Sequence, residues 1–424
     1  MNHFILANGW IIDVVDGKVS KGALEIRNGY IVNIIPGEVE HENLEIVDVN
    51  GKYIIPGLID MHCHINDTFA RQFVASGITT VRNTGGQGLN RLENLLNAPK
   101  DAPTPRVYAA DRLIDGPPGL WGPTNEGNFV TDDPNEAREE VKRQVVAGTK
   151  FIKVYGLLSK EVMDAVVDEA RKHGLEVSCD LIHSTSINAL EAAEIGVTWF
   201  EHASGFIQAM YPGWYPTADK NEWKHIDWQE PDMEKLTELC EKMLAYDVKI
   251  CPTLLINDQI ELFPDFWDPN NYVTNSFSDE DGLTKHWQEM TKHANIFKEQ
   301  LGFQNNMLKT ITKTYFELGG TVVAGTDSPG GLYSFPGMGL HRELELFVEI
   351  GMTELEALQS ATINPAKSIG LDEIGVIKKG KIADLVILEK NPLENIKHTK
   401  DIDSIIKGGK IYRQEEVLEG LNTI

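Results

Sequence analysis

Short apolar segments separated by turn residues form the first fifty positions, and the same pattern returns near the C-terminus. The strand-like segments are residues 4–6, 10–15, 23–27 and 30–35 at one end and 383–388, 402–406 and 410–413 at the other. Asp16-Gly17 and Asn28-Gly29 lie between apolar runs, which is a strong signal for hairpins. Each group is too small to bury a core alone. We therefore expect the two chain ends to pair into one small β-sandwich domain.

Between these ends, short apolar runs alternate with amphipathic stretches. The predicted strands are residues 57–64, 78–82, 106–112, 151–155, 176–181, 198–202, 249–253 and 321–326. The clearest predicted helices are residues 159–173, 186–194, 230–246 and 285–318. Eight strands alternating with helices predict an α/β protein with a (β/α)₈ TIM barrel. We assign residues 56–366 to the barrel, and residues 1–55 and 367–424 to the β-sandwich domain.

Two connections are longer than ordinary loops and rich in aromatic residues. They are residues 207–232 and 262–287, after the sixth and seventh predicted strands. Active sites of barrels lie on the face where strands end, and loops of this length are usually lids or binding loops. The alternative is that their aromatic side chains pack locally against the barrel.

Charge and cysteine content narrow the classes of function. The 424 residues contain 64 Asp and Glu against 39 Lys and Arg, a formal net charge of −25. So acidic a surface repels phosphate backbones and anionic lipid, which disfavours nucleic acid and membranes as partners. No apolar run approaches the roughly 20 residues of a membrane span, and no signal peptide is apparent. Four cysteines without a Cys-x-x-Cys pair favour a reduced, cytoplasmic location.

The strongest chemical signal is the segment PGLIDMHCH at residues 56–64. Residues two apart in a strand point to the same side, so His62 and His64 both face the barrel interior. Two imidazoles that converge at a strand end form half of a metal site. A lone His-x-His motif is weak evidence, but here it ends the first predicted barrel strand.

Further residues of the same kind recur at the ends of later strands: Lys153, His183, His202 and Asp327. Individually, each has an ordinary structural explanation, such as a core histidine, a helix cap or a salt bridge. Together with His62 and His64, they favour a metal site at one rim of the barrel.

This order of residues resembles the amidohydrolase superfamily over nearly the whole chain. Residues 375–391 are similar to that superfamily's return into its small β-sandwich, and residues 344–370 resemble the imidazolonepropionase-like and Xaa-Pro dipeptidase branch. The resemblance implies two divalent metal ions, with His62, His64 and Asp327 at one and His183 and His202 at the other. It also implies that Lys153 is N6-carboxylated and bridges the ions. Zinc suits this ligand set, and such sites also accept manganese or cobalt.

The fifth-strand ligand has an alternative in the sequence. His183 precedes His202 by 19 residues, about one fewer than the resemblance implies. Asp180, three residues earlier, competes for the role. We prefer His183, because its sequence context Leu-Ile-His-Ser fits the family pattern better.

Mechanism and substrate class follow from the resemblance. A hydroxide that bridges two metals is a nucleophile at neutral pH, Asp327 would act as general base and acid, and Tyr155 could donate a hydrogen bond to the oxyanion. Nucleobase deaminases of the superfamily need an acid shortly after a barrel histidine. Here His202 is followed by Ala203, Ser204 and Gly205, so the sequence argues against that subgroup.

The leading hypothesis for the reaction is amide hydrolysis in a small molecule, a dipeptide or an N-acyl amino acid. Hydrolysis of aromatic amides, carbamates or lactones is the alternative, and a non-catalytic scaffold is disfavoured because all six ligands are present. Candidate groups for binding a substrate carboxylate are Arg82, Arg112, His341 and Arg342, with salt bridging elsewhere as the competing explanation. The resemblance also implies a tendency to form homo-oligomers.

Overall fold

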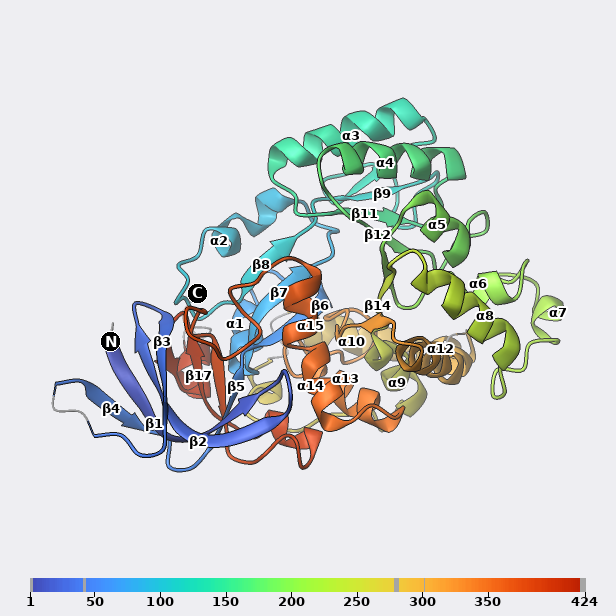
Figure 1. The fold of residues 1–424 in the computed structure, drawn as a ribbon. Helices are drawn as coiled ribbons and strands as arrows, with labels where there is room; N and C mark the ends of the chain where they lie inside the picture. The colour runs from blue at the N-terminus through green and yellow to red at the C-terminus, as the bar shows by residue number, and fades with distance from the viewer. Residues whose placement is uncertain (1–2, 41–42, 278–281, 301, 420–424) are drawn as a thin grey trace.

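The computed structural model describes residues 3–40, 43–277, 282–300 and 302–419. The chain forms a mixed α/β fold in which strands from both ends of the chain share one sheet and the other strands form two parallel sheets (Figure 1). The helices are α1 (Ala70–Ala75), α2 (Glu93–Leu96), α3 (Pro134–Ala147), α4 (Lys160–Lys172), α5 (Ala189–Ile195), α6 (Phe206–Met210), α7 (Lys220–Trp223), α8 (Met233–Leu244), α9 (Leu254–Leu262), α10 (Leu283–Thr291), α11 (Ala294–Gln300), α12 (Asn305–Glu317), α13 (Gly339–Glu349), α14 (Glu354–Ser360), α15 (Ile363–Ser368) and α16 (Gln414–Leu418).

The terminal sheet combines both ends of the chain, as the sequence predicts. Its strands are β1 (His3–Asp13), β2 (Lys18–Arg27), β3 (Tyr30–Pro36), β4 (Glu45–Asp48), β5 (Tyr53–Pro56), β16 (Leu385–Leu388), β17 (Ile402–Lys407) and β18 (Lys410–Tyr412). The two ends meet where β16 pairs antiparallel with β5. Phe4, Ile54, Leu385 and Ile406 belong to one buried cluster, so the ends also share a core. The strands form a single sheet, and a two-layer sandwich stays a prediction.

Two parallel sheets form the rest of the strand framework. One contains β6 (Leu58–Cys63), β7 (Ile78–Asn83) and β8 (Arg106–Ala109); the other contains β9 (Leu113–Asp115), β10 (Asn128–Val130), β11 (Ile152–Tyr155), β12 (Val177–Asp180), β13 (Trp199–Glu201), β14 (Lys249–Cys251) and β15 (Thr321–Val322). Backbone hydrogen bonds connect the two sheets: Met61 in β6 donates to Ala324, just after β15, and Lys150, just before β11, donates to Ala109 in β8, both at 2.9 Å. The eight predicted strands are therefore found, while β9 and β10 were not anticipated.

The helix predictions are confirmed where the sequence contains clear end signals. Helix α4 begins after Ser159, whose hydroxyl accepts a hydrogen bond from the backbone N–H of Val162 at 3.3 Å. The continuous helix predicted over residues 285–318 is wrong. The segment contains α10, α11 and α12. A turn at residues 292–293 separates α10 from α11, and Trp287 and Ala294 on either side of it pack into different buried clusters.

The aromatic residues of the two long connections mostly pack against one another. The Trp214 and Trp228 rings lie 5.4 Å apart, and Trp228 lies 4.5 Å from Phe303. In the second connection the Phe266 ring stacks on Tyr333 at 4.0 Å. Local packing therefore explains much of this aromatic content, which was the alternative considered from the sequence.

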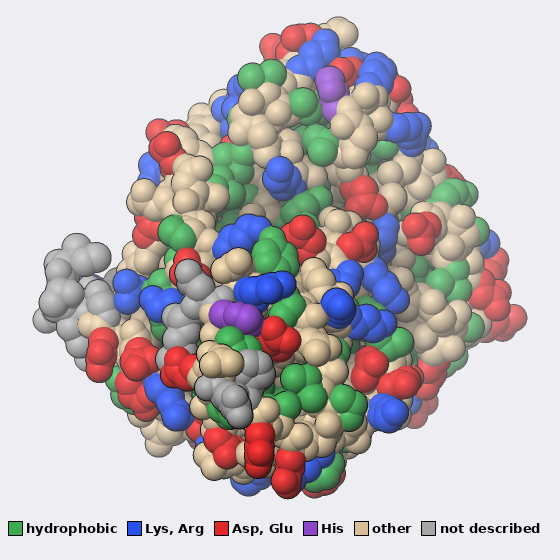
Figure 2. Space-filling view, turned by 60° about the vertical axis from the view of Figure 1, so that its left-hand side comes forward, with side chains coloured by type: hydrophobic (Ala, Val, Ile, Leu, Met, Phe, Trp, Pro, Cys, Tyr) green, Lys and Arg blue, Asp and Glu red, His purple; other side chains and the backbone are tan. Residues whose placement is uncertain are grey.

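On the face drawn in Figure 2, the acidic side chains do not form a single patch. Acidic and basic side chains are interspersed there (Figure 2). Among the residues that the structure describes, no helix is both long and apolar enough to cross a membrane.

Candidate metal centre

The two histidines of the His-x-His motif end a strand that is buried on both sides. Every residue of β6 is buried, as expected for a parallel strand covered on both faces. The carboxylate of Asp60 accepts a hydrogen bond from the backbone N–H of His62 at 3.1 Å. The backbone N–H of His64 donates to the carbonyl of Ser328 at 2.8 Å. These bonds hold both histidines at the end of the strand that faces the segment after β15.

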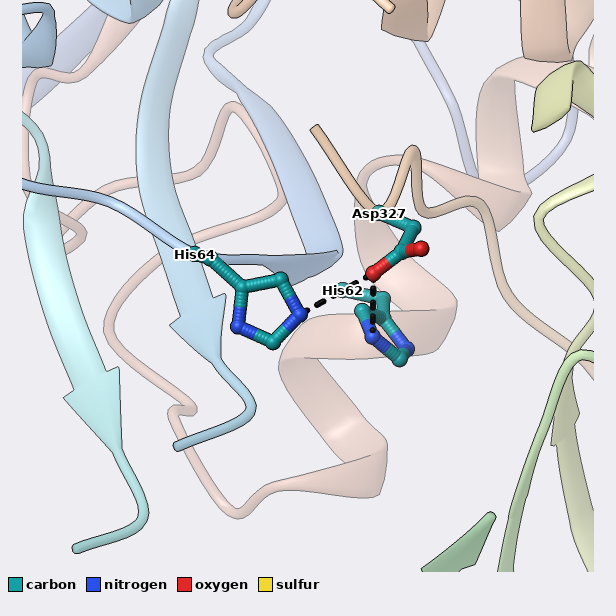
Figure 3. Close-up of side chains that lie close together, drawn as sticks. All are labelled: His62, His64 and Asp327. Atoms are coloured by element: carbon teal, nitrogen blue, oxygen red, sulfur yellow. Dashed lines mark hydrogen bonds and ion pairs between the residues drawn. The ribbon is translucent and has the colours of Figure 1, made fainter. Parts of the chain in front are cut away.

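Asp327 completes a three-residue group with these histidines (Figure 3). Its Oδ1 lies 3.0 Å from Nε2 of His62 and 3.0 Å from Nε2 of His64. The backbone N–H of Asp327 donates to the carbonyl of His62 at 2.7 Å, which places the carboxylate between the rings. Burial favours the neutral acid, but the neighbouring histidines outweigh it and hold the pKa of Asp327 well below its usual range.

A buried glutamate contacts the other nitrogen of His62. Glu201 Oε2 lies 2.6 Å from His62 Nδ1, and Oε1 accepts hydrogen bonds from Arg82 at 2.7 Å and Ser178 at 2.5 Å. Burial opposes ionisation of Glu201, but Arg82, Lys153 and His62 together lower its pKa well below the usual value. The contact fixes the orientation of the imidazole, which is the common role of a carboxylate behind a ligating histidine.

Sequence reasoning missed Glu201. The available signal was an acidic residue directly before His202, inside the otherwise apolar strand Trp199–Glu201. Burial alone would lower the pKa of His62, yet Glu201 and Asp327 raise it to about 9 in the metal-free chain.

His202 joins the group from β13, and Asp180 from β12 lies beside it. The His202 and His62 rings are 4.7 Å apart. His202 Nδ1 lies 2.5 Å from the hydroxyl of Thr253, and Nε2 lies 3.5 Å from Oδ2 of Asp180. Burial lowers the pKa of His202 despite the nearby carboxylates, which keeps the ring in the neutral form that binds metals.

Lys153 and Tyr155 reach the same interior from β11. The Lys153 side chain is fully buried, and its Nζ has no hydrogen-bond partner among the described residues. That nitrogen lies 5.4 Å from the centre of the Tyr155 ring. Burial, with the charges of Asp180 and Asp327, raises the pKa of Tyr155 well above its usual value. The phenol therefore keeps its proton.

His183 lies in the turn beyond the end of β12 and is half-buried. Within the described part of the chain, no hydrogen bond or ion pair joins it to the other predicted ligands. Its role as a ligand stays a prediction.

Arg82, a predicted substrate-binding residue, points into the interior. Its guanidinium contacts Glu201, donates to the carbonyl of Met61 at 3.2 Å, and lies 4.0 Å and 4.6 Å from the ring centres of Phe151 and Trp199. The side chain is 1% exposed. These contacts favour the alternative of a structural salt bridge.

Arg112 and Arg342 also have acidic partners away from the histidines. Arg112 forms a bidentate pair with Glu140, with Nε 2.7 Å and Nη2 2.5 Å from its two oxygens. Arg342 contacts Asp258 at 2.9 Å and Glu349 at 2.6 Å. Substrate binding by either arginine stays a prediction.

His341, the fourth candidate, is buried against the backbone. Its Nε2 lies 3.1 Å from the carbonyl of Ser76, and Nδ1 lies 2.9 Å from the hydroxyl of Thr399. Burial lowers its pKa to about 4, so the ring is neutral at physiological pH and offers no charge to a carboxylate.

Comparison with known proteins agrees with this architecture. Residues 53–253 and 298–412 match the amidohydrolase family. This match covers well over half of the sequence, and the chain belongs to the amidohydrolase family.

Individual relatives show how far the similarity extends. The ochratoxinase of Aspergillus niger is 26% identical over 333 residues, which cover 73% of this chain and 56% of that protein. The chain thus matches little more than half the length of this relative.

Solved structures share the fold at lower sequence identity. A Xaa-Pro dipeptidase with bound methionine in its active site has a TM-score of 0.71 and 22% identity over 97% of this chain and 99% of that chain. The A. niger ochratoxinase structure has a TM-score of 0.65 and 20% identity over 97% of this chain and 96% of its own.

Proposed function

We propose that this chain is a metal-dependent hydrolase that cleaves an amide bond in a dipeptide or an N-acyl amino acid. The observation that carries the proposal is the convergence of His62, His64 and Asp327, whose ligand atoms all lie within 4.8 Å of one another. His202 and Lys153 adjoin this group. Neutral imidazole and carboxylate are the donor set of catalytic zinc sites.

The buried amine of Lys153 also fits a metal centre. A charged ammonium without a hydrogen-bond partner is costly to bury, and it would repel divalent ions. Carbon dioxide can add to the neutral amine, forming a nitrogen–carbon bond and releasing one proton. We propose that Lys153 is carboxylated in this way, because the product is an anionic oxygen donor. His62, His64, Asp327 and His202 would hold two divalent ions with it, and zinc is our first choice.

When bound, the ions lower the pKa of water toward about 7 and polarise a substrate carbonyl. The residues of the chain do the remaining work. Asp327 would take the proton of the attacking water and pass it to the leaving amine. Tyr155, still protonated, would donate a hydrogen bond to the substrate oxygen as negative charge develops. Glu201 would keep His62 in one orientation throughout.

Similarity to known proteins supports the amide substrate. The fold resembles a Xaa-Pro dipeptidase, and the sequence resembles ochratoxinase. A second candidate, hydrolysis of aromatic amides, carbamates or lactones, is favoured by one contact. Trp287 Nε1 donates to the carbonyl of Pro329 at 3.2 Å, which places the second aromatic connection against the segment that carries Asp327.

The proposal also covers the fold around the site, the cellular location of the protein and its partners. We infer that β6, β7, β8 and β11 to β15 close into a (β/α)₈ barrel, since backbone hydrogen bonds connect β6 with the segment after β15 and β8 with the segment before β11. The four cysteines are buried and free, which supports a reduced, cytoplasmic location. A homo-oligomer without nucleic-acid or membrane partners remains part of the proposal.

The test combines metal analysis with a substrate panel. Wild-type protein, Lys153→Ala and the exposed control Lys160→Ala are each assayed for bound metal and for hydrolysis of Xaa-Pro, Xaa-Arg and N-acyl-aromatic amino acids, aromatic carbamates and lactones. We expect about two ions per chain in the wild type and in the control, and loss of both metal and activity in Lys153→Ala. An active, metal-free wild type would refute the metal centre. Turnover of carbamates or lactones with inert dipeptides would favour the second candidate.

A further inference from the structure

We infer that Asp180, in place of His183, is the metal ligand contributed by β12, so that Asp180 and His202 hold the second ion. The inference rests on the proposed function, because it assigns a residue of the same metal centre. It reverses the preference drawn from the sequence, and three structural observations carry it.

The first observation is strand register. In the parallel pair of β11 and β12, Lys153 lies opposite Ser178 and Tyr155 lies opposite Asp180. Side chains two residues apart in a strand point to the same side. The hydroxyl of Ser178 donates to buried Glu201 at 2.5 Å, so this side faces the interior. Asp180, two residues later and at the end of β12, faces the same interior.

The second observation is the pairing of Asp180 with His202. Asp180 Oδ1 accepts a hydrogen bond from the backbone N–H of Ile182 at 2.9 Å. Its Oδ2 lies 3.5 Å from Nε2 of His202. Thr253 occupies the other nitrogen of that ring. One carboxylate oxygen and one imidazole nitrogen are therefore directed toward the same space, with both side chains nearly buried.

The amine of Lys153 is a further donor near Asp180 and His202. The Lys153 amine is fully buried without a hydrogen-bond partner among the described residues, and the strand register sets Lys153 opposite Ser178, two residues before Asp180. Once carboxylated, it would supply an oxygen ligand beside Asp180 and His202. The 4.7 Å separation of the His202 and His62 rings connects this second group with the first.

The third observation concerns the chain before His183. The bond from Ile182 to Asp180 Oδ1 closes a turn directly after the strand. Gln208 Nε2 donates to the carbonyls of Leu181 at 2.9 Å and Ile182 at 3.1 Å. The backbone leading to His183 is thus held in a turn, where His183 is half-buried.

A carboxylate at this position changes the chemistry of the centre. It replaces a neutral nitrogen donor by an anionic oxygen donor, and oxygen-rich sets suit manganese and magnesium better than histidine-rich sets do. The second site should therefore discriminate less strongly between Zn²⁺ and Mn²⁺ than a site with His at position 180.

The experiment compares Asp180→Asn, Asp180→His and His183→Asn after reconstitution with Zn²⁺ or Mn²⁺. Bound metal is counted by mass spectrometry, and affinity is measured by chelator competition. We expect Asp180→Asn to bind one ion fewer, or to lose at least about 100-fold in affinity at that site, the upper end of the effect of changing an outer-shell partner. His183→Asn should keep both ions. Asp180→His should also keep both, with a shift of preference toward Zn²⁺.

Folding is checked independently of metal. Asn keeps the shape of Asp180 and an oxygen that can accept from Ile182, so circular dichroism and thermal unfolding of the metal-free variants should match the wild type. A wild type with two ions whose Asp180→Asn variant also holds two, with unchanged affinity at both sites, overturns the inference alone. Loss of an ion in His183→Asn overturns it as well, whatever Asp180→Asn does. A wild type that binds no divalent ion overturns the proposed function and this inference with it.

Discussion

Neutralising Glu201 should destabilise the fold even without metal. Glu201→Gln keeps the shape of the side chain but removes the negative charge that faces Arg82 at 2.7 Å. The Arg82 and Glu201 side chains are 1% and 0% exposed, so water cannot replace the lost partner. Removing one member of a buried ion pair costs about 3–5 kcal/mol, because the other charge stays buried without compensation. We expect the free energy of unfolding to fall by that amount.

The pair can be isolated with a double-mutant cycle. Arg82→Met removes the cation, together with its contacts to the rings of Phe151 and Trp199. Combined with Glu201→Gln, it removes both members of the Arg82–Glu201 ion pair. The double variant should therefore cost less than the sum of the single variants, by about 1–3 kcal/mol. Urea unfolding of metal-free protein, followed by tryptophan fluorescence, measures all four free energies.

A matched control separates burial from charge removal itself. Glu176→Gln removes a carboxylate that contacts Lys249 at 2.8 Å, but its side chain is 40% exposed. We expect this change to cost less than about 1 kcal/mol. Equal costs for Glu201→Gln and Glu176→Gln, or strictly additive effects in the cycle, would refute the reasoning. In addition, Glu201→Gln should weaken metal binding by about 10- to 100-fold, because His62 loses its orienting carboxylate.

Two further predictions concern residues away from the metal centre. Burial would raise the pKa of Glu140, but hydrogen bonds from Arg112 and Arg143 lower it to about 2 from its usual value of 4.5. Because the folded-state pKa is depressed, Glu140 stabilises the protein above about pH 4.5, and that contribution is lost as the pH falls toward 2. Glu140→Gln should therefore destabilise the protein at pH 7 and progressively less in acid, as followed by urea unfolding at several pH values. Gly116→Ala would place a Cβ atom 1.9 Å from the backbone carbonyl oxygen of Leu157, and the forced backbone shift should cost about 1–3 kcal/mol in thermal unfolding.

Each of these changes has a neighbouring or comparable control. Glu139→Gln alters an exposed carboxylate and should leave the pH profile nearly unchanged. At Gly302 an added Cβ would meet its nearest atom at 3.5 Å, so Gly302→Ala should be tolerated. A pH-independent cost for Glu140→Gln, or a Gly116→Ala variant as stable as Gly302→Ala, would contradict the two predictions.

Local signals in the sequence were sufficient for much of the framework. The period of two in a strand predicted that His62, in β6, and His64, directly after it, point to the same side, and both do face Asp327 (Figure 3). The amphipathic pattern over residues 159–173 predicted α4, which spans Lys160–Lys172. These features depend on residues within a few positions of one another, where backbone geometry alone decides the outcome.

Other features depended on packing between distant segments. The apolar pattern over residues 285–318 fits one helix, but burial of Trp287 and Ala294 in separate clusters divides it. The arginines proposed to bind substrate have acidic partners that the sequence does not reveal, such as Glu140, which lies 28 positions after Arg112. The charge of these arginines suggested that they bind a substrate carboxylate, but the sequence did not show where their side chains lie.

The sequence by itself determined the class of the protein and most of the candidate ligands, because residue type and strand periodicity identify groups that can bind metal. Only the tertiary structure brought Glu201 to His62 across 139 positions of the chain and set Asp180 beside His202. The second contact depends on the register of the neighbouring parallel strands β12 and β13, whereas the first joins β6 and β13, which belong to different sheets. Both contacts are set by packing of the whole interior, and no local pattern along the chain encodes them.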